Sequence, residues 1–74
     1  MIKVRVRLKS FDDVSKFVSI LNRQEGEFDL TSGRNTVDPK SVLGVLSLDI
    51  SKPLQLIIYH ENEILLSELD QYLE

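Results

Sequence analysis

Ser41 carries the hydroxyl group whose position in this sequence best fits a chemical role, the binding of an anion such as a phosphate. It follows Asp38, Pro39 and Lys40, and an almost unbroken apolar run begins directly after it. Asp38 is a favourable N-cap and Pro39 suits the first helical position, so the sequence predicts a helix from Pro39 to about Leu48. Ser41 is then expected in the first turn, where free backbone N–H groups and the helix dipole favour an anion such as a phosphate.

A second serine, Ser10, also lies at a predicted helix start, but its neighbours are acidic. Ser10 and Asp13 form an S-x-x-D pair, a variant of the capping box, ahead of apolar residues at helical spacing. Asp12 and Asp13 place two negative charges where a phosphate would otherwise be welcome, and no base that could activate Ser10 is adjacent. We therefore interpret Ser10 as a structural cap and expect no catalytic residue.

The predicted helix 39–48 carries more apolar residues than one face of a short helix can bury. We expect Val45 and Leu48 to face the sheet, with Gly44 allowing a close approach. The other three are then expected to form a partly exposed apolar patch: Val42, Leu43 and Leu46. The alternative that all five are core residues stays open.

These residues must be positioned by a small α/β domain. Residues 2–9 alternate apolar and basic side chains, which is typical of a half-buried strand. The remaining pattern predicts, in order, a helix at 11–23, strands at 27–31 and 34–37 joined by a turn at 32–33, the helix at 39–48, a strand at 53–59 and a last apolar-striped helix to residue 73 with Asn62 as a possible cap. This order indicates a two-layer sandwich over residues 1–74 as one domain.

Composition excludes several classes of protein. The chain has 74 residues, no cysteine and one histidine, so we expect no cofactor and no metal site. It lacks a signal peptide and any apolar stretch that could span a membrane, which favours a cytoplasmic protein. His60 is interpreted as a surface or turn residue because no partner ligand is visible.

The basic stripe of the first strand raises the possibility of RNA binding. Aromatic residues for base stacking are not interleaved with it, and the net charge of the chain is −3. We interpret it as a solvated strand face, balanced by acidic residues on neighbouring strands. Its members are Lys3, Arg5, Arg7 and Lys9.

Residues 36–48 resemble the regulatory-serine region of HPr, the histidine-containing phosphocarrier family of the bacterial phosphotransferase system. That family has a lysine-serine pair at a helix start, then two bulky apolar residues, a glycine and a valine, as in Lys40-Ser41-Val42-Leu43-Gly44-Val45. The resemblance implies a βαββαβα fold, a four-stranded antiparallel sheet covered on one face by three helices. It also implies phosphorylation of Ser41 by a dedicated kinase, carbon catabolite regulation, and partner binding by Lys40, Val42, Leu43 and Leu46.

The phosphocarrier motif of the family is replaced. In a gapless comparison from Ser41, the phosphorylated histidine falls at Ser10, the following arginine at Asp12 and the proline at Asp13. The chain thus resembles the histidine-lacking type of HPr paralogue, a regulatory module and not an enzyme. The implied partners are proteins, such as an HPr kinase-like enzyme or a transcriptional regulator, without nucleic acid or membrane. A monomer and a strand-exchanged homodimer are both compatible with the resemblance.

Two rival interpretations remain at this point. One is a domain that still passes phosphoryl groups through another residue. The other is a ferredoxin-like module that binds a ligand or RNA and has no link to sugar transport. Strand order bears on the second rival, because HPr places the fourth strand between the first and the second.

Overall fold

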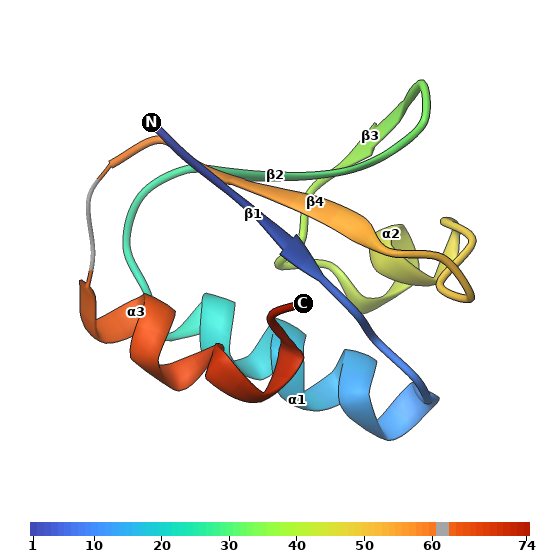
Figure 1. Cartoon of the computed structure of the whole chain (residues 1–74), viewed down its shortest axis with the longest axis horizontal. Coiled ribbons are helices and arrows are strands. Elements are labelled where there is room, and N and C mark those ends of the chain that lie inside the picture. The colour runs from blue at the N-terminus through green and yellow to red at the C-terminus, as the bar shows by residue number, and fades with distance from the viewer. Residues whose placement is uncertain (61–62) are drawn as a thin grey trace.

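Four antiparallel strands form one sheet, and helices pack against one of its faces (Figure 1). The computed structural model describes residues 1–60 and 63–74. Its elements are β1 (Ile2–Val6), α1 (Phe11–Asn22), β2 (Phe28–Ser32), β3 (Asn35–Val37), α2 (Val42–Leu46), β4 (Leu54–Ile58), α3 (Glu63–Glu68) and a 3-10 turn (Asp70–Tyr72). The predicted order of elements is confirmed, and Asn62, the suggested cap of the last helix, lies outside the described residues.

The fourth strand lies between the first and the second. The sheet order is β1-β4-β2-β3, with Leu56 opposite both Val4 and Leu30. Gly33, with φ of +58°, is the first residue of the two-residue turn between β2 and β3, where a positive φ matches the twist of the strands. The predicted α+β sandwich with an antiparallel sheet is therefore correct, and its strand order is compatible with the HPr resemblance.

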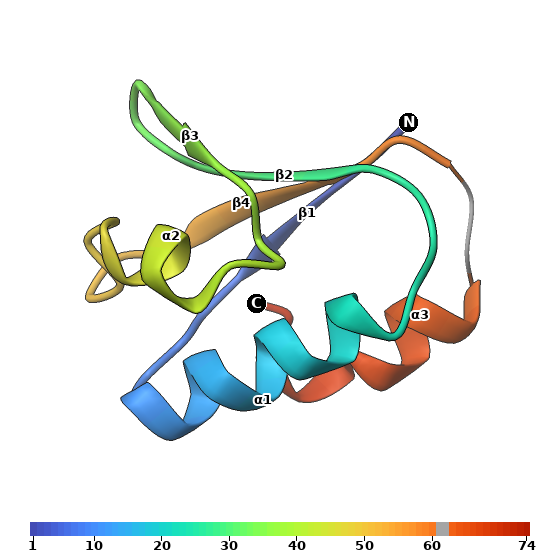
Figure 2. The ribbon, with the colours of Figure 1, turned by 180° about the vertical axis from the view of Figure 1, so that it is seen from behind.

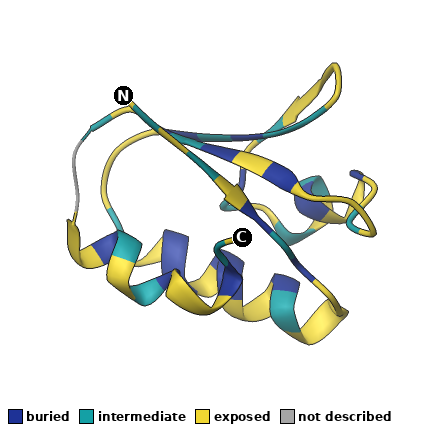
Figure 3. Ribbon diagram, in the orientation of Figure 1, coloured by how far each residue is buried: buried dark blue, intermediate teal, exposed yellow. Residues whose placement is uncertain are grey.

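The core fills the space between the sheet and the helices (Figure 3). Leu54, Leu56 and Ile58 alternate along β4 and are all buried, because every second side chain of a strand faces the same side. Phe17 of α1 meets Tyr72 edge to face, with 6.0 Å between the ring centroids. The burial of these side chains fixes α1 and the C-terminal helix side by side under the sheet, as Figure 2 shows from behind.

The C-terminal residues join the sheet at the outer edge of β1. The backbone N–H of Arg7 donates to the carbonyl of Tyr72 at 2.7 Å, and that of Glu74 donates to the carbonyl of Arg5 at 3.0 Å. Leu73 forms an isolated antiparallel bridge with Val6. The sequence gives no signal for this pairing, because residues 69–73 continue a helical apolar pattern.

The helices of the described chain are short. In residues 1–60 and 63–74, none is long and apolar enough to cross a membrane.

Candidate functional site

Ser41 is the N-cap of α2, directly before the first helical residue Val42, whereas the sequence predicted it inside the first turn. Its Oγ accepts a hydrogen bond from the backbone N–H of Gly44 at 3.1 Å, and its φ of −108° and ψ of 118° are those of extended backbone. The predicted cap Asp38 and the helical start at Pro39 are wrong. The Asp38 carboxylate instead accepts from the N–H of Lys40 at 2.9 Å, which closes a local turn before the helix.

Gly44 also has a different role from the one expected. A Cβ on Gly44 would lie 3.3 Å from the Cβ of Ser41 and 3.4 Å from its Oγ, and 3.3 Å from the carbonyl of Asp38. The glycine therefore allows a close approach to the serine and not to the sheet. Ser41 is exposed, and its hydroxyl oxygen accepts from the helix N-terminus.

The cap hydrogen bond predicts how α2 responds to changes at Ser41. Ser41→Ala should lower the free energy of unfolding by about 0.5–2 kcal/mol, because the N–H of Gly44 loses its acceptor. Ser41→Asp should stay within about 0.5 kcal/mol of the parent, because a carboxylate caps as well as a hydroxyl. Urea denaturation of both variants checks this. A collapse of Ser41→Asp would show that the helix start cannot hold a negative group.

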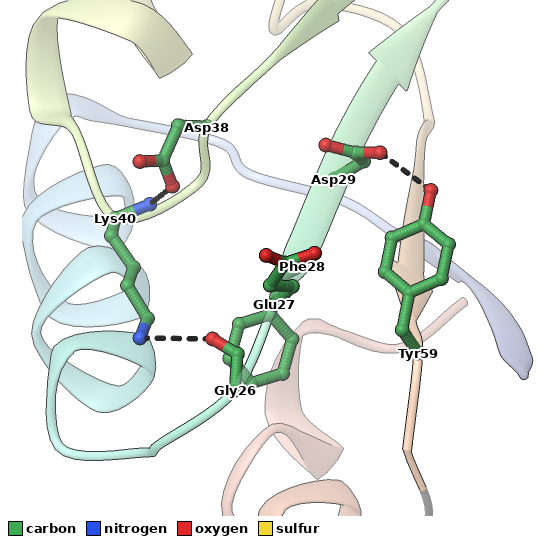
Figure 4. A pocket seen from close by; sticks show the side chains of 7 residues that line it. All are labelled: Gly26, Glu27, Phe28, Asp29, Asp38, Lys40 and Tyr59. Carbon is green, nitrogen blue, oxygen red and sulfur yellow. Dashed lines mark hydrogen bonds between the residues drawn. The ribbon is translucent and has the colours of Figure 1, made fainter.

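Lys40 does not lie beside the Ser41 hydroxyl as a phosphate partner. Its Nζ donates to the carbonyls of Gln24 at 2.8 Å and Gly26 at 3.3 Å, and lies 5.3 Å from the ring centroid of Phe28 (Figure 4). The carbonyl of Lys40 also accepts from the Asn22 side chain at 2.9 Å. The lysine thus joins the turn before α2 to the end of α1, and its ammonium is engaged with these carbonyls.

Removing the ammonium of Lys40 should therefore affect stability. Lys40→Met keeps most of the aliphatic stem but leaves two carbonyls without their charged donor, which should cost about 1–2 kcal/mol. Lys52→Met is the matched control, since Lys52 makes one exposed ion pair with Asp49 at 3.9 Å and should change stability by less than about 0.5 kcal/mol. Equal melting temperatures for the two variants would contradict the joining role of Lys40.

The apolar residues of α2, together with Leu48 shortly after its end, divide as expected between core and surface. Val45 and Leu48 are buried, whereas Leu43 is 82% exposed and Leu46 is 39% exposed. Val42 is half-buried against the core, so it borders the exposed surface and is not central to it. The alternative that all five are core residues is wrong. We call Leu43 and Leu46 the α2 patch.

The start of α1 is a structural cap, as interpreted from the sequence. Ser10 Oγ accepts from the N–H of Asp13 at 3.1 Å, and the Asp13 carboxylate accepts from the N–H of Lys9 at 2.9 Å. Asp12 pairs with Lys16 at 2.9 Å, and this hydrogen bond raises the pKa of Lys16. The serine oxygen and both carboxylates are therefore already engaged in ordering the helix.

Phe11 is a surface residue that the sequence pattern concealed. It fits the spacing of the buried stripe of α1, but it occupies the first helical position and is 63% exposed. The segment before it lies beside the loop after α2, because Leu8 and Lys9 line a shallow pocket together with Ile50 and Ser51. Phe11 is thus a further exposed apolar side chain, next to the capping serine of α1.

An acidic pocket of about 530 Å³ lies between the turn before α2, the start of β2 and Tyr59 (Figure 4). Tyr59 donates to the Asp29 carboxylate at 2.5 Å, and this hydrogen bond raises the pKa of Tyr59 above its usual value. The hydrogen bond therefore favours the protonated phenol. Within the described residues, no three His, Asp, Glu or Cys side chains are grouped to hold a metal. The pocket is lined by Gly26, Glu27, Phe28, Asp29, Asp38, Lys40 and Tyr59.

His60 was expected to be a surface or turn residue, and it lies in a bend directly after β4. It is half-buried, and its ring lies 5.4 Å from that of Phe28 at an angle of 57°. Among the described residues, its Nε2 is buried and has no hydrogen-bond partner. Its tilted contact with Phe28 and the small size of Gly26 explain its position.

No protein-family model, no curated protein and no solved structure matches the chain. What the geometry offers is an exposed capping serine with two exposed leucines on the same short helix. It offers no activated nucleophile or acid-base pair among the groups described above.

Proposed function

We propose that this protein is an HPr-like regulatory module of the bacterial phosphotransferase system, without the phosphocarrier histidine. It acts in the cytoplasm by binding other proteins and is not an enzyme. The observation that carries the proposal is the exposed hydroxyl of Ser41 next to the α2 patch of Leu43 and Leu46. Modification of a group at the start of a helix can change which partners bind to the exposed surface of the same helix.

The strand order supports the family side of the proposal. HPr places its fourth strand between the first and the second, and the sheet here has the order β1-β4-β2-β3. The Lys40-Ser41-Val42-Leu43-Gly44-Val45 match then falls at the start of the second helix, where the family carries its regulatory serine. Because the order agrees with the family, it weighs against the ferredoxin-like alternative.

Phosphorylation of Ser41 would change the α2 patch electrostatically. A phosphate adds about −1.5 to −2 charges next to apolar side chains that a partner would otherwise bury. The backbone N–H groups at the helix start can donate hydrogen bonds to the phosphate oxygens, but the ammonium of Lys40 is engaged with the carbonyls of Gln24 and Gly26. The phosphorylated form should therefore favour partners that bring their own arginines, and disfavour partners that need a neutral surface.

The proposal predicts that the phosphocarrier reaction fails. Ser10 has no activating base, and Asp12 and Asp13 repel an incoming phosphoryl group. After incubation with Enzyme I and phosphoenolpyruvate, the intact mass should be unchanged. A stoichiometric gain of phosphate that is lost in acid would contradict the proposal and favour the rival of a phosphoryl carrier.

Restoring carrier activity should require more than the missing histidine. Ser10→His supplies the nucleophile but leaves the charge of Asp12 beside it. Ser10→His with Asp12→Arg should accept phosphate several-fold to about tenfold faster, since exposed charges at a helix start are each worth about 0.3–1 kcal/mol. Rapid-quench measurement of the two variants checks this. Equal rates would show that the reversed charge has no part in the loss of function.

A further inference from the structure

The outer edge of β1 is covered at one end only. The C-terminal residues pair with it through the carbonyl of Arg5 and the N–H of Arg7, in the antiparallel direction. In an antiparallel ladder, the N–H and C=O of a residue point to the same side, and every second residue points the same way. Lys3 must therefore direct its N–H and C=O to this outer side too, and no described residue is paired with it there.

The two faces of this edge differ in chemistry. Lys3 and Arg5 are exposed on the face of the sheet turned away from the helices. Ile2 and Val4 face the core but are only half-buried, because β1 is the last strand of the sheet on this side. An added strand would meet positive charge on one face and uncovered apolar surface on the other.

The protein's own C-terminal residues show which sequence pattern this edge accepts. Leu73 lies opposite Val6 and is partly buried against the core, while the Glu74 carboxylate lies 3.8 Å from Arg5 and 3.7 Å from Arg7. An apolar residue thus faces the core and an acidic residue faces the basic stripe. The acidic partner of this stripe comes from the C-terminus and not from neighbouring strands, which corrects the interpretation made from the sequence.

We propose that the free edge of β1 binds an extended partner segment in which apolar and acidic residues alternate. The segment adds to the sheet antiparallel to β1, along the path that Leu73 and Glu74 begin. One acidic residue lies opposite Lys3 and exchanges both backbone hydrogen bonds with it. The two flanking apolar residues cover Ile2 and Val4. This mode of recognition takes its affinity from the strand edge and its specificity from alternate side chains.

Titration with a synthetic peptide tests the proposal. The probe is an acetylated, amidated six-residue peptide that alternates leucine and glutamate, added to the full chain at low salt and followed by amide chemical shifts. Saturable shifts are expected at Lys3 and Arg5, with a dissociation constant of about 1 mM or tighter. The same peptide with lysine in place of glutamate should bind at least about tenfold more weakly, because it places like charges opposite each other.

Two changes separate backbone pairing from charge attraction. Lys3→Pro removes the outward N–H without removing a hydrogen bond to β4, and should abolish binding, whereas Lys3→Ala keeps the N–H and should weaken it only several-fold. If Lys3→Pro does not fold, N-methylation of the central glutamate of the peptide removes a backbone donor with the protein unchanged. Binding that survives both changes, or shifts confined to other strands, would overturn the proposal. Concentration-dependent shifts at Lys3 without peptide would also overturn it, since a second copy would then occupy the edge.

Discussion

Leu48→Ala is expected to lower the free energy of unfolding by about 2–5 kcal/mol, while Leu43→Ala should change it by less than about 0.5 kcal/mol. The two substitutions remove the same atoms from residues five positions apart. Leu48 is buried in the core and Leu43 is 82% exposed, so only the first leaves a cavity. Urea denaturation of both variants measures the difference directly.

The same pair tests the α2 patch as a docking surface. Leu43→Ala should cost about 1–2 kcal/mol in the binding of a protein partner, because an exposed leucine is buried only in the complex. A loss of stability for Leu43→Ala as large as for Leu48→Ala would place Leu43 in the core. The docking hypothesis would then have no exposed leucine at its centre.

Gly26→Ala is expected to destabilise the protein by about 2–5 kcal/mol. Gly26 has a φ of +108°, which a residue with a Cβ rarely adopts, and its new Cβ would overlap Cε1 of His60. Either the backbone or the histidine must move, and the stacking of His60 on Phe28 would be lost. Thermal and urea unfolding of the variant provide the measurement.

Gly33→Ala is the matched control for this prediction. Gly33 also has a positive φ, +58°, but a Cβ there meets no atom within 4 Å, so only the backbone cost of about 1–2 kcal/mol applies. The excess loss of Gly26→Ala should fall when His60 is also replaced by alanine, because the overlap is removed. An equal cost at both glycines would show that His60 does not constrain residue 26.

Much of the fold follows from local pattern. The alternation predicts strands at 2–9 and 53–59 with one buried face, and the shorter strands β1 (Ile2–Val6) and β4 (Leu54–Ile58) form within these ranges. The Ser10 cap and the burial of Val45 and Leu48 also follow from sequence, because capping and amphipathic spacing act within one element. The exposure of Leu43 follows for the same reason.

Most of the features that the sequence pattern does not predict involve partners that are distant in sequence. The ammonium of Lys40 bonds to carbonyls 14 and 16 residues earlier. Glu74 meets Arg5 and Arg7 from the other end of the chain. The helix start at Asp38 was misplaced because aspartate, followed by proline and then a serine, can close a turn as readily as it can cap. The spacing of apolar residues along the sequence carries no information on any of these three contacts.

The proposed function makes Ser41, and not Ser10, the regulated residue of the protein. The most direct measurement is incubation of the protein with an HPr kinase and ATP, followed by intact mass and peptide mapping. The parent protein should gain one acid-stable phosphate at Ser41, Ser10→Ala should gain it equally, and Ser41→Ala should gain none. No phosphate on the folded parent protein, or a phosphate that maps to another residue, would contradict the claim.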